Sequence, residues 1–553
     1  TLFFSAATGQ ELPRWDESDD HANQMAFSPD GKILAQAMSG VLRLRDVKTG
    51  KPSVPVRGLP NSCMAVRFSR DGKSLIAGCR GGRIGKWNPL TGAPLTPLRD
   101  PPEGFGRQAP AALLGTTLTA HGERAALVNA DGILHLWEPA TGKELCRIAD
   151  PPVVWDQADF SPDGKVVSVK HEDDIIRLWD ARTGKLLRSL SRGRGRFPQP
   201  RAFSPDGRTL AIGPDYPDKG VIHLFETATG KEEGRIVWRD NTDVNDLLFT
   251  PDGKYLLTAH WRRMQAEGGP PERGDGEDAL RLWDRASGRE VRRIRIPVSS
   301  FQSITISRDG KTLAASVGDT ILLWELASGA ERGRFSGHRE GIRSLAFSPD
   351  GRLLASGSFD HTACVWDVTG ICPDGKWSPR PVQKDELEHL WTDLGNKDGV
   401  RAYRALWGLA AAGPSSVAFL AQRLRPVPRV KDEQLTRLLV DLDSERFETR
   451  ERATLELQRL GEQAEPALRK ALADKPSLEV SRRLQALLDH LESRTLSTEQ
   501  LHALRAVEVL EQVGTAEART VLRSVAAGAP ADRLTREAKA ALQRLSGRTV
   551  REP

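Results

Sequence analysis

The chain has 553 residues, of which 39% are hydrophobic and 28% charged, and its formal net charge is +6. These values are ordinary for a folded globular protein with more than one domain and exclude an intrinsically disordered chain. No apolar run approaches the ~20 residues that a membrane-spanning helix needs. The positive charge is spread along the length, so by itself it does not indicate a nucleic-acid-binding protein.

Residues 20 to 370 contain eight copies of one repeat, at intervals of about forty residues. Each copy runs through Phe-Ser-Pro-Asp-Gly-Lys, a short apolar stretch, Leu-Trp-Asp and Thr-Gly-Lys. Short alternating runs bounded by turns predict strands, and each copy predicts one four-stranded blade of a β-propeller. The Phe position is held by Phe27, Phe68, Leu118, Phe160, Phe203, Phe249, Ile306 and Phe347, and the Trp position by Arg45, Trp87, Trp137, Trp179, Phe225, Trp283, Trp324 and Trp366.

The two ends of this region each contain an incomplete blade. The last copy, which ends at Asp367, has no convincing fourth strand, whereas Ala7–Leu12 has the form of a fourth strand without the other three. We therefore expect Ala7–Leu12 to complete the eighth blade and close the ring, which covers both exposed edges. In the alternative, Thr1–Ser5 is the remnant of a third strand, and a longer parent protein holds more blades.

These repeats resemble the WD-repeat family of β-propellers, in the form found in bacterial proteins, over about two thirds of the chain. The resemblance implies a structural hydrogen-bonded tetrad in the last repeat, made of His338, Ser356, Asp360 and Trp366. In that tetrad, His338 links Asp360 to a hydroxyl and does not bind a metal. The other repeats depart from the tetrad, so we expect apolar packing to hold them together.

A change of composition follows Trp366. Residues 369–383 form a Pro-rich linker, and beyond it apolar residues recur at the three- and four-residue spacing of amphipathic helices. The predicted domains are an eight-bladed propeller at 1–368, the linker at 369–383 and an all-α domain at 384–553. Ser497 opens a capping-box sequence at one helix start.

The helical region also repeats. Alignment of the Arg-Ala pairs at 404–405, 452–453 and 505–506 places Gly413, Gly461 and Gly514 at the same position of each unit. About three helical hairpins at a period near fifty are predicted, stacked as a solenoid. This pattern resembles HEAT repeats of the bilin-lyase-like type, a resemblance that implies a fold more than an activity.

Searches for reactive motifs find little. The chain contains no Gly-x-Ser-x-Gly, no Gly-x-x-x-x-Gly-Lys-Ser/Thr and no His-Glu-x-x-His, and the clusters around His121 and His171 are predicted to lie in solvated loops. Five cysteines form no Cys-x-x-Cys pair and indicate small core residues in a reducing compartment, the cytoplasm. We therefore expect no catalytic residues, no metal and no cofactor, and not an enzyme.

Two long insertions interrupt the repeats, and both are predicted to lie on one rim of the ring. They carry arginine and aromatic residues, the types enriched at binding hot spots, and arginine pairs bidentately with carboxylates. We therefore interpret them as a candidate rim for an acidic protein segment, made of Arg192, Arg194, Arg196, Phe197, Arg201, Trp261, Arg262 and Arg263.

Three classes of function remain open from the sequence. The first is a non-enzymatic protein-protein interaction scaffold in which both domains offer docking surfaces. The second is a nucleic-acid-associated protein that uses the arginine-rich rim, and the third is an enzyme of bilin-lyase or propeller-hydrolase type. Because residue 1 is not Met, the chain could also be the docking or sensory part of a larger signalling polypeptide, tethered to a membrane by an upstream segment.

Overall fold

The computed structural model divides the chain into two compact units, Thr1–Gly329 with Gly333–Lys376, and Trp377–Pro553 with Ala330–Arg332. The structure describes residues 3–4, 11–12, 22–38, 42–47, 52–55, 63–69, 73–79, 83–88, 93–99, 115–119, 124–128, 133–138, 143–148, 158–171, 175–190, 200–214, 220–240, 242–262, 278–296, 301–358, 363–370, 382–474, 476–493 and 496–549.

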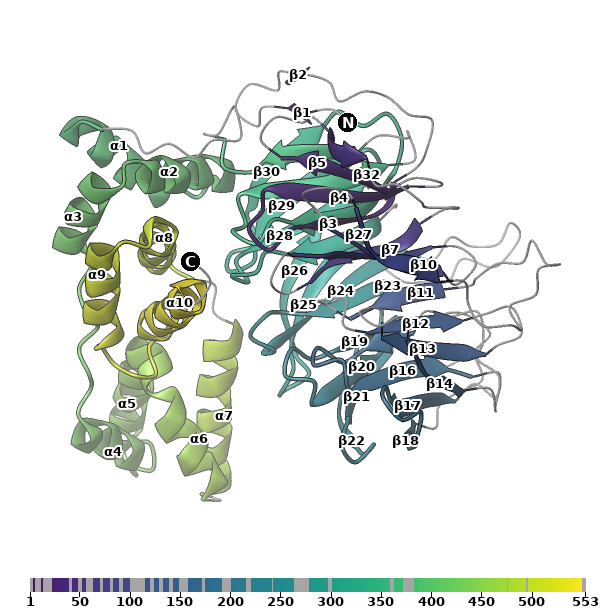
Figure 1. The fold of residues 1–553 in the computed structure, drawn as a ribbon. Coiled ribbons are helices and arrows are strands. Elements are labelled where there is room, and N and C mark those ends of the chain that lie inside the picture. Colours follow the sequence, from purple (N-terminus) through teal and green to yellow (C-terminus); the bar gives the residue numbers. More distant parts are fainter. Residues whose placement is uncertain are drawn as a thin grey trace, which may run out of the picture. The chain divides into compact units, whose positions relative to one another are not determined.

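The first unit is a β-propeller of eight sheets, seven of them four-stranded (Figure 1). In the seven four-stranded sheets the strands pair in sequence order, so each of these repeats of the sequence is one blade. Blade 1 is β3(Ala22–Phe27), β4(Ile33–Met38), β5(Leu42–Asp46) and β6(Pro52–Pro55), and blade 2 is β7(Cys63–Phe68), β8(Leu75–Cys79), β9(Arg83–Trp87) and β10(Pro94–Arg99). Blade 3 is β11(Gly115–Leu118), β12(Ala125–Val128), β13(Leu134–Glu138) and β14(Lys143–Ile148), and blade 4 is β15(Asp159–Phe160), β16(Val166–Lys170), β17(Ile176–Asp180) and β18(Leu186–Leu190).

Blade 5 comprises β19(Arg201–Phe203), β20(Thr209–Ile212), β21(Val221–Glu226) and β22(Glu232–Val237). Blade 6 comprises β23(Thr242–Phe249), β24(Tyr255–Arg262), β25(Ala279–Asp284) and β26(Glu290–Arg295), and blade 7 β27(Phe301–Ile306), β28(Thr312–Val317), β29(Thr320–Glu325) and β30(Glu331–Ser336). Blade 8 contains β31(Ile342–Phe347), β32(Leu353–Ser358) and β33(Ala363–Asp367), together with the N-terminal strands β1(Phe3–Phe4) and β2(Glu11–Leu12).

Apolar side chains between neighbouring blades form the core of the ring. Trp324 of blade 7 is buried with Leu282 of blade 6, and Trp366 of blade 8 with Leu323 of blade 7. Blades 8 and 1 meet in the same way, through Ala355 and a group that includes Leu34. The aromatic position of the repeat therefore packs against the preceding blade, as expected when single blades cannot bury both faces.

The turns between the first and second strands of the blades interlock around one rim. In blade 5, the Ser204 hydroxyl donates to Asp206 at 2.6 Å, and Gly207 adopts φ +69°. A Cβ on Gly207 would lie 3.7 Å from the Cδ of Pro162 in the blade 4 turn. Likewise, a Cβ on Gly253 of blade 6 would lie 3.5 Å from the Cδ of Pro205 in the blade 5 turn. Each turn thus needs glycine for its backbone and receives the proline of the blade before it.

The N-terminus completes blade 8, but not with the predicted segment. The strand beside β33 is β1, which pairs with it in parallel through Phe3 opposite Val365. The segment that ends at Leu12 contributes β2, which pairs with β1 at the outer edge of the sheet. The prediction that residues 7–12 lie beside the last strand was wrong by one strand, because Phe3–Phe4 pairs with β33 and separates β2 from it.

The second unit is all α-helical in the ranges that the structure describes, as predicted (Figure 1). None of its helices has the length and apolar character required to cross a membrane. The helices are α1(Lys384–Leu394), α2(Gly399–Ala411), α3(Pro414–Arg423), α4(Asp432–Asp441), α5(Phe447–Leu460), α6(Glu465–Ala473), α7(Leu478–Ser493), α8(Thr498–Val513), α9(Ala516–Ala526) and α10(Arg533–Thr549).

The three predicted glycines end helices, but the helices pair differently from the predicted hairpins. Gly413, Gly461 and Gly514 follow α2, α5 and α8 with φ values of 57°, 58° and 67°. Of the helix pairs that flank these glycines, only α8 and α9 pack closely, whereas α1 packs with α2, α4 with α5, α6 with α7 and α9 with α10. The helices also depart from a linear stack, because α2 packs against α8 and α3 against α9, although α4 to α7 lie between them in the chain. Helices α4 to α7 share their own apolar core, which includes Leu435, Leu457, Leu468 and Leu484.

Candidate functional site

In blade 8, three of the four predicted tetrad residues are in contact. His338 precedes β31, Ser356 lies in β32 and Trp366 in β33, and all three are buried. The Nε2 of His338 lies 2.8 Å from the Ser356 hydroxyl, and the Trp366 indole N–H donates to the same hydroxyl at 2.7 Å. Asp360 lies outside the described residues. These contacts join the segment before the first strand to the second and third strands.

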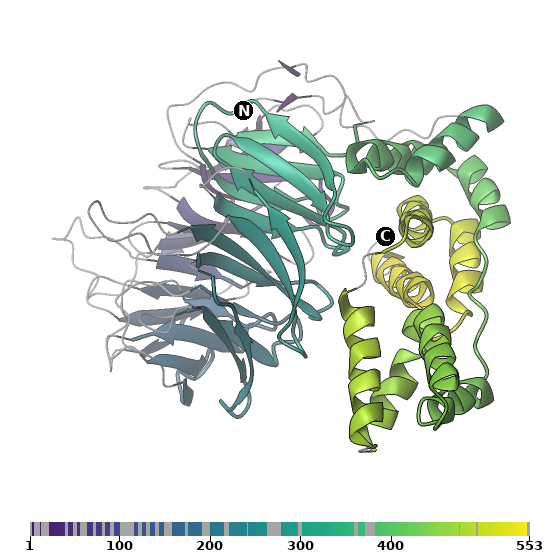
Figure 2. The same cartoon turned by 180° about the vertical axis from the view of Figure 1, so that it is seen from behind.

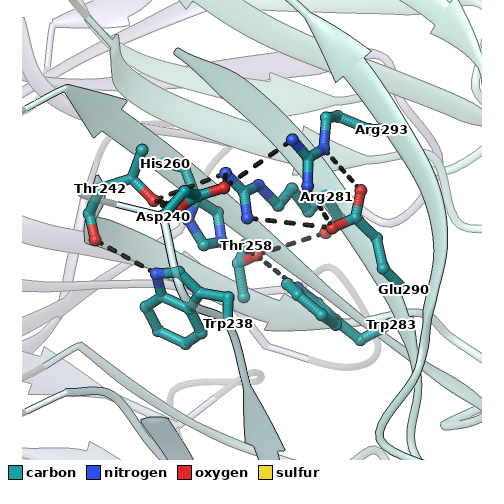
Figure 3. A network of polar contacts seen from close by, with 9 residues as sticks. All are labelled: Trp238, Asp240, Thr242, Thr258, His260, Arg281, Trp283, Glu290 and Arg293. Atoms are coloured by element: carbon teal, nitrogen blue, oxygen red, sulfur yellow. Dashed lines mark hydrogen bonds and ion pairs between the residues drawn. The ribbon is translucent and has the colours of Figure 1, made fainter. Parts of the chain in front are cut away.

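Blade 6 contains a larger network of polar side chains (Figure 3). Asp240 stands nine residues before Phe249, at the position that His338 has relative to Phe347. Thr258 takes the place of Ser356, two residues beyond the strand partner of the blade's tryptophan. The histidine of this blade, His260, lies in the second strand, β24, whereas the histidine of blade 8 precedes the first strand. The nine members are Trp238, Asp240, Thr242, Thr258, His260, Arg281, Trp283, Glu290 and Arg293.

A directed chain of hydrogen bonds runs through His260. Trp283 donates to the Thr258 hydroxyl at 2.8 Å, and this hydroxyl lies 2.8 Å from the Nε2 of His260. The Nδ1 lies 2.9 Å from the Thr242 hydroxyl, which donates to the Asp240 carboxylate at 2.6 Å. Because Thr242 gives its single proton to Asp240, Nδ1 must donate to Thr242. The network therefore assigns His260 as a neutral Nδ1–H tautomer that accepts at Nε2.

Burial keeps this imidazole uncharged. It lowers the pKa of His260 well below 6.5, and the positive charges of Arg281 and Arg293 act in the same direction. The ring lies edge-on to Trp238 at a centroid distance of 4.9 Å and 6.1 Å from the ring of Trp283. At neutral pH the histidine is an uncharged polar link between two threonines.

Two arginines and two carboxylates balance the charge of the network. Arg281 is fully buried and donates to Asp240, and its second terminal nitrogen lies 3.8 Å from a carboxylate oxygen of Glu290. Arg293 holds Glu290 in a bidentate pair at 2.7 and 2.8 Å. A buried arginine without such partners would be costly, so the two acidic residues are a condition for Arg281 to occupy this site.

The same arrangement recurs in blades 3 and 5. A basic residue stands two positions before the aromatic of the third strand. Its partner is the glutamate directly opposite that aromatic on the fourth strand, and an arginine three residues after the glutamate also pairs with it. The three sets are His135, Glu144 and Arg147; His223, Glu232 and Arg235; and Arg281, Glu290 and Arg293. Burial also lowers the pKa of His135.

Two further blades replace the tetrad with other polar pairs. In blade 1, the buried Arg45 donates to Gln36 at 3.1 Å. In blade 4, Trp179 donates to the Nε2 of His171 at 3.1 Å, and His171 is fully buried. The prediction that His171 lies in a solvated loop was therefore wrong: His171 directly follows β16, and its buried ring accepts the hydrogen bond of the tryptophan. Polar pairs thus add to the apolar packing that was expected to hold these blades together.

The hydrogen bonds and ion pairs of these networks link neighbouring strands to one another. Each titratable side chain of the blade 6 network contacts another member of the same blade. Across the described ranges, no three His, Cys, Asp or Glu side chains are placed to hold a metal ion.

The candidate rim is described only in part. Arg192, Arg194, Arg196, Phe197 and Arg263 lie outside the described residues, as do the side chains of Trp261 and Arg262, whose backbones extend β24. Arg201 lies in β19, where its side chain is 1% exposed and its Nε lies 2.8 Å from the carboxylate of Asp159. Arg201 is thus an internal residue of the ring, and the other rim residues stay a prediction.

One signal in the sequence could have found the blade 6 network. The fourth strands of blades 3, 5 and 6 read Glu-x-x-Arg, and a basic residue stands two positions before the preceding aromatic. This pattern has the period of the repeat, but it falls at positions that the Phe-Ser-Pro-Asp-Gly and Trp-Asp motifs do not include.

Comparison with known proteins agrees with the fold of the first unit. The family model "WD domain, G-beta repeat" matches residues 329–367. A computationally designed protein, Ika8, is similar in structure, with a TM-score of 0.50 and 19% identity over 64% of this chain and 98% of that one. The C-terminal WD40 domain of Sif2 has a TM-score of 0.49 and 14% identity over 62% of this chain and 97% of its own. No curated protein matches the sequence.

Proposed function

We propose that the protein is a non-enzymatic interaction scaffold whose propeller and helical unit each offer a docking surface. One observation carries the proposal: in blade 6, the histidine, arginines and carboxylates that could perform chemistry are paired with one another, and their charges balance. Such a network stabilises the blade and leaves the outer surface as the part that meets other molecules. WD40 propellers generally serve as protein-interaction scaffolds, which supports the same function.

The helical unit fits this function as a HEAT-like array of hairpins. Its helices pair through small buried residues, such as Ala405 in α2 and Ala506 in α8, which allow close approach. Arrays of this kind present extended surfaces for partners. We place the scaffold in the cytoplasm on its cysteine usage, since Cys146 and Cys364 are free thiols.

For the propeller, we propose that the arginine-rich insertions bind an acidic protein segment. The test is a pull-down with the triple variant Arg192→Ser, Arg194→Ser and Arg196→Ser, compared with the wild type. The triple variant is expected to unfold at the same temperature as the wild type and to lose the partner.

Arg201→Ser serves as the contrasting variant. It removes the buried partner of Asp159 and is expected to lower the unfolding temperature. Capture of the same partners by the triple variant and the wild type would remove the acidic-segment proposal. If the wild type binds RNA or duplex DNA in a salt-sensitive way and the triple variant does not, the nucleic-acid-associated function is favoured instead.

A further inference from the structure

Three large apolar side chains stand exposed at one end of the α4–α7 bundle. Val440, Phe447 and Leu478 are 68%, 63% and 71% exposed. Val440 lies in the last turn of α4, Phe447 begins α5 and Leu478 begins α7. Apolar side chains gathered on a surface in this way mark sites of interaction.

Chain direction brings these three positions to the same end of the bundle. Helices α4 and α5 pack as a hairpin, and so do α6 and α7 (Figure 2). The end of α4 therefore lies beside the start of α5, and the start of α7 follows the end of α6. A hydrogen bond of 3.4 Å from the Ser477 hydroxyl to Asp443 joins the two turns. We call Val440, Phe447, Leu478 and these two turns the turn-end surface.

None of the three apolar residues is needed by the bundle core. That core is already filled by Leu442 after α4, Leu457 of α5 and Leu484 of α7, all fully buried. The exposed residues point away from it, so removing them costs the bundle little stability. A change at the turn-end surface can therefore be tested without unfolding the unit.

The charge around this surface is opposite in sign to that of the chain. Between Val440 and Arg450 and between Asp474 and Glu479 the sequence carries six carboxylates and three basic residues, whereas the whole chain has a net charge of +6. Two of the arginines nearby are already engaged: Arg450 donates to backbone carbonyls of the α4–α5 turn, and Arg483 pairs with Glu479. The carboxylates of Glu445 and Glu448 are exposed, and within the described residues no ion pair is formed by either.

We infer that the turn-end surface docks a basic amphipathic segment of a partner protein. Its apolar side chains would contact Val440, Phe447 and Leu478, and its lysines or arginines would face Glu445, Glu448 and Asp474. Apolar anchors supply most of the affinity of such contacts, and complementary charge sets specificity and the association rate. The inference rests on the proposed scaffold function and assigns one of its surfaces.

The test uses the full chain and two synthetic helix-forming peptides labelled with fluorescein. Both carry leucines at three- and four-residue spacing, with lysines on the flanks of one and glutamates on the flanks of the other. We expect the lysine peptide to bind and the glutamate peptide not to bind in fluorescence anisotropy.

The variant with Val440→Ser, Phe447→Ser and Leu478→Ser is expected to weaken binding of the lysine peptide about tenfold or more. Glu445→Gln with Glu448→Gln is expected to weaken it about threefold and to reduce its salt dependence. Val237→Ser, which removes a 54% exposed apolar residue of the propeller, is the matched control and should bind as the wild type does.

The inference is overturned if the wild type and the Val440/Phe447/Leu478 variant bind the lysine peptide equally, if both peptides bind equally, or if neither binds. It is also overturned if the wild-type chain self-associates and this variant does not, because the surface would then join two copies. If the wild type and this variant capture the same partners, the scaffold function remains and only the role of this surface is removed.

Discussion

At the scale of single residues, Arg281 is the group on which the blade 6 network depends. It is fully buried, and its partners Asp240 and Glu290 are 20% and 23% exposed. Removing one member of a buried ion pair leaves the others without compensation. The partial exposure of the two carboxylates lets water reduce that cost.

Arg281→Met is therefore expected to destabilise the propeller by about 3 kcal/mol, the lower end of the range for breaking a buried pair. The measurement is the midpoint of urea unfolding followed by tryptophan fluorescence. Arg147→Met is the matched control, because Arg147 grips Glu144 in the equivalent set of blade 3 but is 49% exposed. If Arg147→Met lowers the free energy of unfolding as much as Arg281→Met does, burial is not the reason for the importance of Arg281.

The buried histidines predict how stability changes with pH. Because the pKa of His260 is well below 6.5 in the folded protein, the unfolded chain binds a proton below that pH that the folded chain does not. Stability should therefore fall as the pH falls below about 6.5, by at most about 1.4 kcal/mol per pH unit for this one group. The lowered pKa values of His135 and His502 act in the same direction.

His260→Gln isolates the contribution of one histidine. The variant is expected to lose less stability than the wild type between about pH 7.5 and about pH 5.5, although it is less stable at the higher pH. Asp246 acts in the opposite direction, since burial raises its pKa to about 6, but it is present in both proteins. Parallel pH profiles of the two proteins would show that His260 does not titrate on unfolding.

At the scale of elements, the Ser-Pro-Asp-Gly turns fix the spacing of adjacent blades. Gly207 adopts φ +69°, and an added Cβ would lie 3.7 Å from Pro162 of the preceding turn, an ordinary contact distance, so the backbone conformation is what requires glycine. Gly207→Ala is expected to lower the free energy of unfolding by roughly 1–2 kcal/mol, because a side chain is strained in this conformation.

Gly333→Ala is the matched control for that change. Gly333 lies in β30, its φ is not in the left-handed region, and an added Cβ would meet no atom within 4 Å. The alanine should be tolerated there or slightly stabilising, since it reduces the freedom of the unfolded chain. Urea unfolding of both variants checks the comparison, and equal losses would mean that backbone conformation is not the cause.

At the scale of the whole propeller, the ring is completed by strands from opposite ends of the unit. Phe3 and Phe4 pair with Val365 and Trp366 of β33. A chain that lacks residues 1–18 is therefore expected to expose the edge of β33 and to unfold at a lower temperature, with the helical unit unaffected. Calorimetry measures both transitions.

A chain that lacks only residues 1–2 is the control for this truncation, because β1 begins at Phe3. It should unfold as the full chain does. An unchanged propeller transition in the longer truncation would mean that the ring does not need its N-terminal strands.

The amino-acid sequence alone determined the repeated elements of this protein. Eight blades, the change to helices after Trp366 and the glycines that end helices all follow from local signals, namely strand alternation, turn residues and helical periodicity. The three described members of the blade 8 tetrad also lie together as the motif predicts. Such features are legible because each depends on residues close together in the chain.

Only the tertiary structure decided which distant residues meet. It placed β1 and not Ala7–Leu12 beside β33, and it packed α2 against α8 and α3 against α9. It also turned Arg281 inward, where two carboxylates and a neutral histidine surround it. The pairing of β1 with β33 and of α2 with α8 joins segments far apart in the chain, for which composition and spacing carry no local signal.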